Sequence, residues 1–458
     1  MNIKNYQTYK KEIKNQLKLF VPFLLGQLSS CAMGTVDTVM AGLYGTVDIS
    51  GVAIACSFYW PAYLCLAGVA SALTPTVSHL LGAKREKEIP DAFYNALIVC
   101  FICSMIIMLL LSQCYRIFNF IDADAAMVKV AVDYLFFVML SIPATVIFNL
   151  VRALFDGHSY IKPSLVICVI MLILNIPLNY IFIFGKCGIP AMGGVGCGIT
   201  SCIINFIAAA MFYIYMKKTA VFKPYFINYH FNFDFGFIKK FVKLCVPIGI
   251  SRTMEVACFS LASVIIASFG PTIVAAHSIC INISSLIFMI PFSLCLTATI
   301  RTAYAMGEKS FEKALISLKC VSFLNMILLL IYMSTTFILR EFFASLYTND
   351  PYVIELASSL LIINCIFMFP DSIQIVLMGV VQGFKDSKTV FFTTLFAYWM
   401  VGLPLSYALS HGTFTEPLKA HGIWISFTVT LLICSVIYAL RVRYIFKNKV
   451  MPKLLLES

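Results

Sequence analysis

Long apolar runs recur twelve times along the chain, separated by short polar stretches. Each run has about 20 to 28 residues, which as a helix crosses the roughly 30 Å hydrocarbon core of a bilayer. The pattern therefore predicts an all-α integral membrane protein with twelve transmembrane helices. We place them near residues 17–42, 51–80, 91–114, 127–151, 163–184, 196–216, 241–269, 273–300, 312–339, 352–380, 389–409 and 422–440.

The basic residues alternate between the two ends of these runs. Of the 33 lysines and arginines, 27 lie in the N-terminal arm, the even-numbered loops and the C-terminal tail. The odd-numbered loops hold Arg116, Lys129, Lys186, Arg340 and Lys419. Because cytoplasmic loops carry the excess of positive charge, the pattern predicts a multi-pass protein of the plasma (inner) membrane with both termini in the cytoplasm.

The chain repeats itself once. Five residues of the first half recur 225 positions later: Lys18, Val21, Pro22, Gly82 and Lys84 return as Lys243, Val246, Pro247, Gly307 and Lys309. Four more recur at offsets of 226 or 227: Pro143, Gly157, Lys162 and Pro177 return as Pro370, Gly383, Lys388 and Pro404. Six runs per half give both halves the same orientation, which is typical of transporters with a central site between parallel repeats. We predict two six-helix bundles, residues 1–216 and 241–458, joined by a cytoplasmic linker at 217–240.

Composition agrees with the membrane class. The chain is 61% hydrophobic and 12% charged, with a mean hydropathy of +0.93, whereas soluble domains are about 25% charged. The net charge of +12 lies in loops of one side, so we expect the lipid bilayer, and not nucleic acid, as the partner of this charge. The 17 cysteines are scattered through apolar runs, where we expect them to pack as small apolar residues.

Three carboxylates lie inside predicted transmembrane helices. Counted at 1.5 Å per residue, Glu255 and Asp371 lie about 18 and 21 Å from the cytoplasmic edge, and Asp37 lies about 28 Å from it. A charge at the centre of a membrane helix costs about 2.5–3.5 kcal/mol, so such residues usually face a polar cavity and serve a function. Glu255 and Asp371 are thus predicted at similar depth in the second bundle.

Neighbouring residues suggest what these acids bind. Phe259 follows Glu255 by four residues and Phe367 precedes Asp371 by four, so each acid shares a helix face with an aromatic ring. A carboxylate beside a ring suits a lipophilic cation, although it equally suits a sodium ion or a proton. In the first bundle Asn175 and Asn179 flank Pro177, and we expect their amides to reach Asp37.

Structural interpretations compete with these functional ones. Arg252 lies one turn before Glu255, so the two form a buried ion pair in the alternative interpretation. Independently of this pair, the alternative for Asp371, Asp37 and the two asparagines is a structural role as hydrogen-bonding partners between helices. No Walker motif, HExxH or GxSxG occurs, so we predict neither an enzyme nor ATP-driven transport, and no cofactor beyond Na⁺ or H⁺ as coupling ion.

Motifs throughout the chain resemble those of the multidrug and toxic compound extrusion (MATE) family, in its NorM-like bacterial branch. They are VDTVMAG at 36–42, GAK at 82–84, RALFDGHSYIKP at 152–163, LNIPLNYIF at 174–182, PIGISRTMEV at 247–256, AAHSI at 275–279, GFKDSKT at 383–389, AYWMVGLPLSY at 397–407 and HGIWISF at 421–427. The resemblance implies a V-shaped pair of six-helix bundles, acting as a monomer, that exports small organic cations and drugs in exchange for sodium or protons.

The resemblance also implies roles for particular residues. Glu255 and Asp371 would be the coupling carboxylates and would hold sodium, if sodium is the ion, with the ring of Phe259 beside them. Phe288 would be the aromatic residue of the eighth span, and Asp350 the outer acid before the tenth. Asp37, Asn175 and Asn179 would form the polar cluster of the first bundle.

The sequence leaves two questions open. Arg252 departs from the family pattern, and a fixed cation one turn from Glu255 leaves both sodium and protons as possible coupling ions. A flippase for a lipid-linked oligosaccharide, from the same wider superfamily, is the alternative function. Such flippases usually have a more basic cavity, whereas the predicted membrane interior here holds three acids against one arginine.

Overall fold

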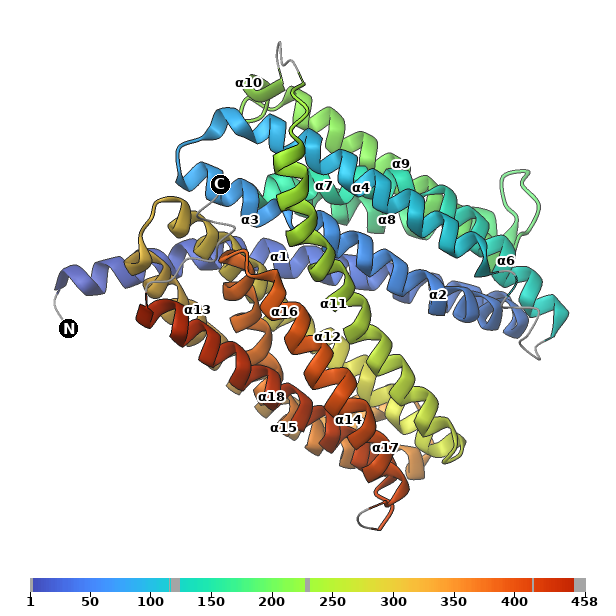
Figure 1. The fold of residues 1–458 in the computed structure, drawn as a ribbon. Helices are drawn as coiled ribbons and strands as arrows, with labels where there is room; N and C mark the ends of the chain where they lie inside the picture. The colour runs from blue at the N-terminus through green and yellow to red at the C-terminus, as the bar shows by residue number, and fades with distance from the viewer. Residues whose placement is uncertain (1–2, 115, 117–123, 227–230, 414–415, 449–458) are drawn as a thin grey trace. The chain divides into compact units, whose positions relative to one another are not determined.

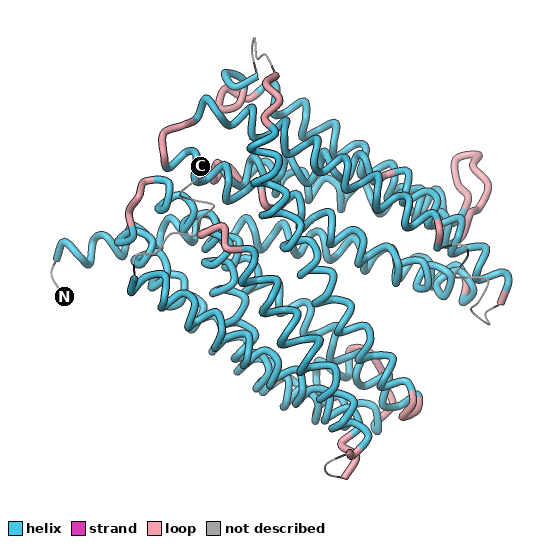
Figure 2. The backbone as a smooth tube through the Cα atoms, in the orientation of Figure 1, coloured by secondary structure: helices cyan, strands magenta, loops and turns pink. Residues whose placement is uncertain are grey.

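The computed structural model describes residues 3–114, 116, 124–226, 231–413 and 416–448. Within these ranges all regular secondary structure is helical (Figures 1 and 2). The first half contains α1 (Ile3–Tyr44), α2 (Thr46–Ser71), α3 (Leu73–Gly82), α4 (Ile89–Ser112), α6 (Ala125–Leu140), α7 (Ile142–Gly157), α8 (Lys162–Phe184), α9 (Gly194–Lys218) and the short α10 (Lys223–Phe226). The second half contains α11 (Phe235–Ala267), α12 (Pro271–Gly307), α13 (Phe311–Ile338), α14 (Arg340–Ser345), α15 (Pro351–Gly383), α16 (Ser387–Thr394), the π-helix η2 (Leu395–Gly402), α17 (Leu403–His411) and α18 (Lys419–Asn448).

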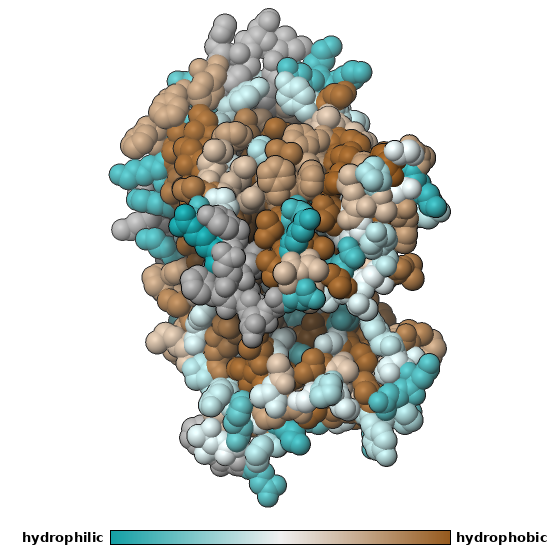
Figure 3. Space-filling model, turned by 90° about the vertical axis from the view of Figure 1, so that its right-hand side faces the viewer, coloured by the Kyte–Doolittle hydropathy of each residue, from teal (hydrophilic) through white to brown (hydrophobic). Residues whose placement is uncertain are grey.

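The helices are long and apolar enough to cross a membrane. Eleven helical stretches of the described chain meet this criterion, and α6 and α7, bent by 48° at their junction, make a twelfth if they form one span. This agrees with the twelve spans predicted from the apolar runs. Hydrophobic side chains cover much of the face drawn in Figure 3, as expected where lipid takes the place of water.

The structure confirms the internal repeat at the level of atomic contacts. Thr74 Oγ1 donates a hydrogen bond to the carbonyl of Ala153 (3.2 Å), and 225 positions later Thr299 Oγ1 donates to the carbonyl of Gly379 (2.9 Å). Gly157 also repeats as Gly383. A Cβ on Gly157 would lie 3.0 Å from the Thr74 carbonyl oxygen, and one on Gly383 would lie 2.9 Å from that of Thr299. Both halves therefore need glycine at the same close crossing.

The chain divides into two compact units. Unit 1 comprises residues 1–24 and 250–458, and unit 2 comprises residues 25–249. Helices α1 and α11 therefore each continue from one unit into the other. Each carries a proline shortly before the change, Pro22 in α1 and Pro247 in α11, and these are the pair that the repeat relates at an offset of 225.

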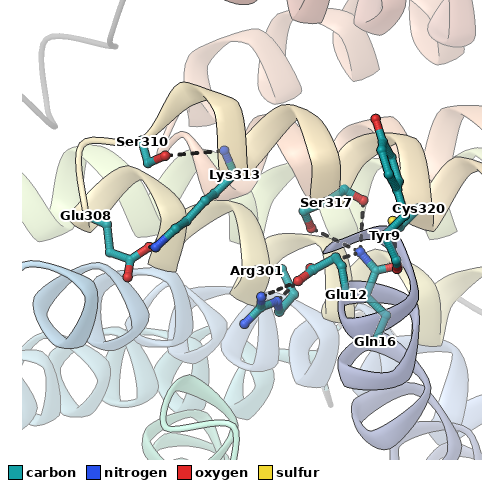
Figure 4. A network of polar contacts seen from close by, with 9 residues as sticks. All are labelled: Tyr9, Glu12, Gln16, Arg301, Glu308, Ser310, Lys313, Ser317 and Cys320. Carbon is teal, nitrogen blue, oxygen red and sulfur yellow. Dashed lines mark hydrogen bonds and ion pairs between the residues drawn. The ribbon is translucent and has the colours of Figure 1, made fainter. Parts of the chain in front are cut away.

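A network of polar contacts attaches the start of α1 to the rest of unit 1 (Figure 4). Arg301 of α12 forms a two-pronged ion pair with Glu12, with Nε–Oε1 and Nη2–Oε2 distances of 2.9 and 2.5 Å. One turn further on, Gln16 Nε2 donates to the backbone carbonyl (2.9 Å) and the hydroxyl (3.1 Å) of Ser317 on α13. Glu12 and Gln16 are buried, 8% and 0% exposed. The first turns of α1 are thus fixed by side-chain bonds and not only by apolar packing.

The described part of the linker between α9 and α11 is attached to unit 2. Tyr225 of α10 donates to Glu86 Oε2 (3.0 Å), and Asn95 of α4 bonds to the backbone of both Asn232 and Asp234. Burial, together with the bond to Glu86, raises the pKa of Tyr225 to about 12. The phenol is therefore protonated at neutral pH and remains a donor to this carboxylate.

Candidate functional site

Glu255 lies in the middle of α11, where two side chains hold its carboxylate. Arg252 Nη1 is 3.5 Å from Oε2, and the Tyr398 hydroxyl donates to Oε1 at 3.3 Å. The Arg252 guanidinium also lies 5.1 Å from the centre of the Phe292 ring. The side chains of Arg252 and Glu255 are 18% and 17% exposed. The ion pair of the structural interpretation is thus present. Both contacts of Glu255 are long, however, and therefore weak.

Asp371 lies on α15 next to a proline. Pro370 has no N–H to donate inside the helix, and its own carbonyl accepts a hydrogen bond from Ser435 Oγ of α18 (2.8 Å). Asp371 is 8% exposed, and its carboxylate accepts a long hydrogen bond of 3.4 Å from Gln374 Nε2. Asp371 and Glu255 also interact electrostatically. The structure therefore places the two predicted coupling acids within electrostatic reach of each other in unit 1.

The aromatic rings one helical turn from each acid, Phe259 and Phe367, pack with rings of α18. Phe259 packs edge-on against Phe427 of α18, with ring centres 4.6 Å apart. Phe367 contacts Phe427 (6.5 Å) and, more closely, Trp424 (5.3 Å). The two phenylalanines predicted beside Glu255 and Asp371 thus meet in one aromatic cluster formed by α11, α15 and α18, which we call the ring cluster (Phe259, Phe367, Trp424 and Phe427).

Phe288 and Asp350 lie in other surroundings. The Phe288 ring stacks on Phe292, with centres 5.7 Å apart and planes at 20°, so it adjoins the ring beneath Arg252. Asp350 is exposed and caps α15, where Oδ1 accepts from the Tyr352 N–H at 3.0 Å. It lies 21 residues before Asp371 on this helix, about 30 Å along its axis. The structure therefore does not bring Asp350 together with the two acids.

Asp37 forms a separate polar cluster in unit 2. Asn175 and Asn179 both donate to its Oδ1, at 2.9 and 2.6 Å, and Asn179 also donates to Asn175 Oδ1 at 3.2 Å. Both asparagines are fully buried, and Asn179 Oδ1 has no partner in the described structure. The amides reach Asp37 as the spacing around Pro177 predicts, whereas the role of the cluster in transport stays a prediction.

Four residues near the acids were not predicted from the sequence: Tyr398, Trp399, Trp424 and Phe427. The first two lie in η2 and the last two on α18, within AYWMVGLPLSY and HGIWISF. Those motifs contributed to the family resemblance, but periodicity gave no reason to turn these side chains toward Glu255. A π-helix changes the direction of the side chains that follow it, and apolar periodicity does not reveal it.

The acids suit a hard cation better than a transition metal. Within the described residues no group of three or more His, Cys, Asp or Glu side chains could hold a metal ion. Two carboxylates and a hydroxyl are instead hard oxygen ligands, which alkali and alkaline-earth ions prefer. Either carboxylate could equally take up a proton.

These features define a class of protein. Repeated halves, many apolar helices and buried acids beside aromatic rings are typical of a secondary membrane transporter. The chain belongs to the MatE family, whose sequence model matches it twice, at residues 22–181 and 247–408. The two matches begin 225 positions apart, in agreement with the repeat.

Relatives and solved structures support the same assignment. The chain is 36% identical over 443 residues to multidrug resistance protein NorM of Vibrio vulnificus, covering 96% of this chain and 97% of the relative. It is 33% identical over 445 residues to multidrug resistance protein MdtK of Yersinia pseudotuberculosis, with 96% and 97% coverage. The fold matches the eukaryotic MATE transporter AtDTX14 with a TM-score of 0.86 at 19% identity, covering 98% of both chains. It also matches an outward-facing multidrug resistance MATE transporter with a TM-score of 0.86 at 18% identity, covering 98% of this chain and 97% of that one.

Proposed function

We propose that the protein is a cation-coupled antiporter that exports amphipathic, mostly cationic drugs and toxic compounds by alternating access. The observation that carries the proposal is the placement of Glu255 and Asp371 together in unit 1, beside the ring cluster. The relatives named NorM and MdtK are multidrug resistance proteins, which supports multidrug export. They do not favour the flippase alternative.

The coupling follows from the charge on the two acids. Neighbouring carboxylates in a low-dielectric site cannot both stay charged and empty, so each state of the cycle fills them with a proton, a sodium ion or a cationic drug. The ring cluster supplies apolar surface and cation–π attraction for an amphipathic cation. Drug and coupling ion therefore compete for Glu255 and Asp371, and competition at one site is what an antiporter needs.

The driving force depends on the charge of the drug. One positive charge that moves inward releases about 2.3 kcal/mol per 100 mV of membrane potential. A neutral drug leaving for one entering ion is driven by this potential and by the ion gradient. A monovalent cation leaving for one ion is electroneutral, so the ion gradient alone drives it. In this proposal the protein acts as a monomer in the bacterial inner membrane, with both termini in the cytoplasm.

The test is transport of a fluorescent organic cation into vesicles that contain the purified protein. A sodium gradient or a pH gradient is imposed, one at a time and without a membrane potential. We expect at least one of the two ion gradients to drive the dye in the direction opposite to the ion. Protein-free vesicles should show no such dye movement. Dye movement that is indifferent to both gradients would contradict the proposal. Export of a lipid-linked oligosaccharide by the same vesicles, without dye transport, would favour the flippase.

A further inference from the structure

An unusual helix lies opposite Glu255. Residues Leu395–Gly402 form the π-helix η2 between α16 and α17, and π-helical segments are rare and frequently mark functional sites. Two local features accompany it. Pro404 provides no N–H for the carbonyl four residues earlier, and Gly402 packs so tightly that a Cβ there would lie 2.6 Å from Thr430 Oγ1.

This π-helix turns two consecutive side chains toward α11. The Tyr398 hydroxyl donates to Glu255 Oε1 at 3.3 Å, and Trp399 Nε1 donates to the carbonyl of Met254 at 3.1 Å. Tyr398 is 3% exposed, and its ring lies edge-on to Phe259, with centres 6.2 Å apart. Its own carbonyl also accepts a bond from Cys258 Sγ at 3.6 Å. Tyr398 is therefore held against α11 by contacts of both its side chain and its backbone.

The Tyr398 hydroxyl contacts Glu255 and lies within electrostatic reach of Asp371. A phenol has one donor hydrogen and lone pairs that accept. It can donate to an ionised Glu255, and after rotation about the C–O bond it can present a lone pair to a cation between the acids. A sodium ion gains from such a third oxygen ligand, whereas a proton bound to Glu255 or Asp371 does not need one.

We propose that Tyr398 is a specificity-determining residue, whose hydroxyl oxygen is a neutral ligand for a sodium ion held by Glu255 and Asp371. The proposal rests on the proposed function, since it assumes that these two acids bind the coupling ion. Removing the hydroxyl then weakens sodium binding selectively and leaves the response to protons in place.

The corresponding helix of unit 2 has a related arrangement. Pro177 of α8 precedes Pro404 by 227 positions, and the asparagines on either side of it donate to Asp37 of α1. In each unit a proline-containing helix therefore brings polar groups to an acid on the first helix of that half. The groups differ, two amides in unit 2 and a phenol in unit 1, so the two units do not supply the same ligands.

The test uses Tyr398→Phe in the full-length purified protein, because phenylalanine keeps the ring and removes only the hydroxyl. Equilibrium binding of a fluorescent organic cation is measured across sodium concentrations at fixed pH, then across pH without sodium. We expect the sodium concentration for half-displacement to rise about tenfold and the pH response to stay within about twofold of wild type. Trp399→Phe is the matched control. It removes the neighbouring bond to Met254 but no group that contacts an acid, so its sodium response should match wild type.

Three outcomes would overturn the inference. One is a Tyr398→Phe protein with the wild-type sodium response. Another is an equal loss of the sodium and proton responses with a lowered melting temperature, which would make Tyr398 a packing residue. The third is a wild type that responds to protons alone, which leaves the proposed function intact. Asp371→Asn distinguishes failure of this inference from failure of the proposed function. If Asp371→Asn changes neither the sodium response nor the proton response, the proposed function fails as well.

Discussion

Glu255 is the residue at which ion pairing and ion binding oppose each other. Its carboxylate lies 3.5 Å from Arg252 and 3.3 Å from the Tyr398 hydroxyl. A guanidinium at this distance neutralises part of the charge that would attract a coupling cation. Arg252 is itself held over Phe292, so we regard it as a fixed competitor that weakens sodium binding to Glu255.

Arg252→Ala tests this competition. We expect sodium to bind about tenfold more tightly, equivalent to about 1.4 kcal/mol, because the competing cation is gone. The free energy of unfolding should fall by about 1–3 kcal/mol, since Glu255 is left with only the long bond from Tyr398. Sodium titration of dye binding and the melting temperature measure the two effects. Arg252→Lys keeps the positive charge and should retain the wild-type sodium affinity. No change in either quantity for Arg252→Ala would remove Arg252 from the account.

At this scale the sequence predicted the acids better than their surroundings. Asp37, Glu255 and Asp371 stand out because a carboxylate in an apolar run is costly. The i,i+3 and i,i+4 spacings also identified Arg252, Phe259 and Phe367 as neighbours. By contrast, the ring cluster depends on how α18 packs against α11 and α15. Contacts between helices distant in the chain leave no periodic signal in either one.

At the scale of elements, the ends of the long helices differ most from the prediction. The apolar run predicted a first span at 17–42, whereas α1 begins at Ile3. The added turns are polar, so hydropathy excludes them. They are helical because Glu12 and Gln16 bond to α12 and α13. The π-helix was missed for a different reason, since apolar periodicity does not reveal a change of helix type.

The ion pair between Glu12 and Arg301 should stabilise unit 1. Arg301→Ala leaves the buried Glu12 without its cation, and we expect a loss of about 1–3 kcal/mol in the free energy of unfolding. The melting temperature of the purified protein measures it. Lys313→Ala in the same network is the control, because it breaks a pair in which Lys313 is 62% exposed and should cost less than about 1 kcal/mol.

A charge exchange extends this test. The double variant Glu12→Arg, Arg301→Glu restores opposite charges at the two positions, so it should recover part of the stability lost in Arg301→Ala. Equal melting temperatures for Arg301→Ala and Lys313→Ala would show that the pair contributes no more than a surface contact.

At the scale of the whole molecule, the duplication was predictable from the sequence and the division into units was not. Offsets of 225 to 227 identified the two halves, because glycine and proline recur where backbone geometry requires them. Nothing in the apolar pattern showed that residues 1–24 group with unit 1, or residues 235–249 with unit 2. That grouping depends on tertiary contacts such as those of Glu12 and Gln16.

The account of transport rests on Asp371 together with Glu255. Asp371 is 8% exposed, accepts a long hydrogen bond from Gln374, and interacts electrostatically with Glu255. Asn is almost the same size as Asp but cannot carry the negative charge that binds a cation. Asp371→Asn should therefore keep the fold and remove the coupling between ion and drug.

The most direct measurement is dye transport by Asp371→Asn in vesicles under an imposed sodium or pH gradient. We expect transport to fall to the level of protein-free vesicles, with a melting temperature close to that of wild type. Asp124→Asn is the matched control, since Asp124 is an exposed cap of α6 and asparagine caps helices equally well; it should transport at the wild-type rate. Transport by Asp371→Asn at the wild-type rate under the same gradient would contradict the central claim.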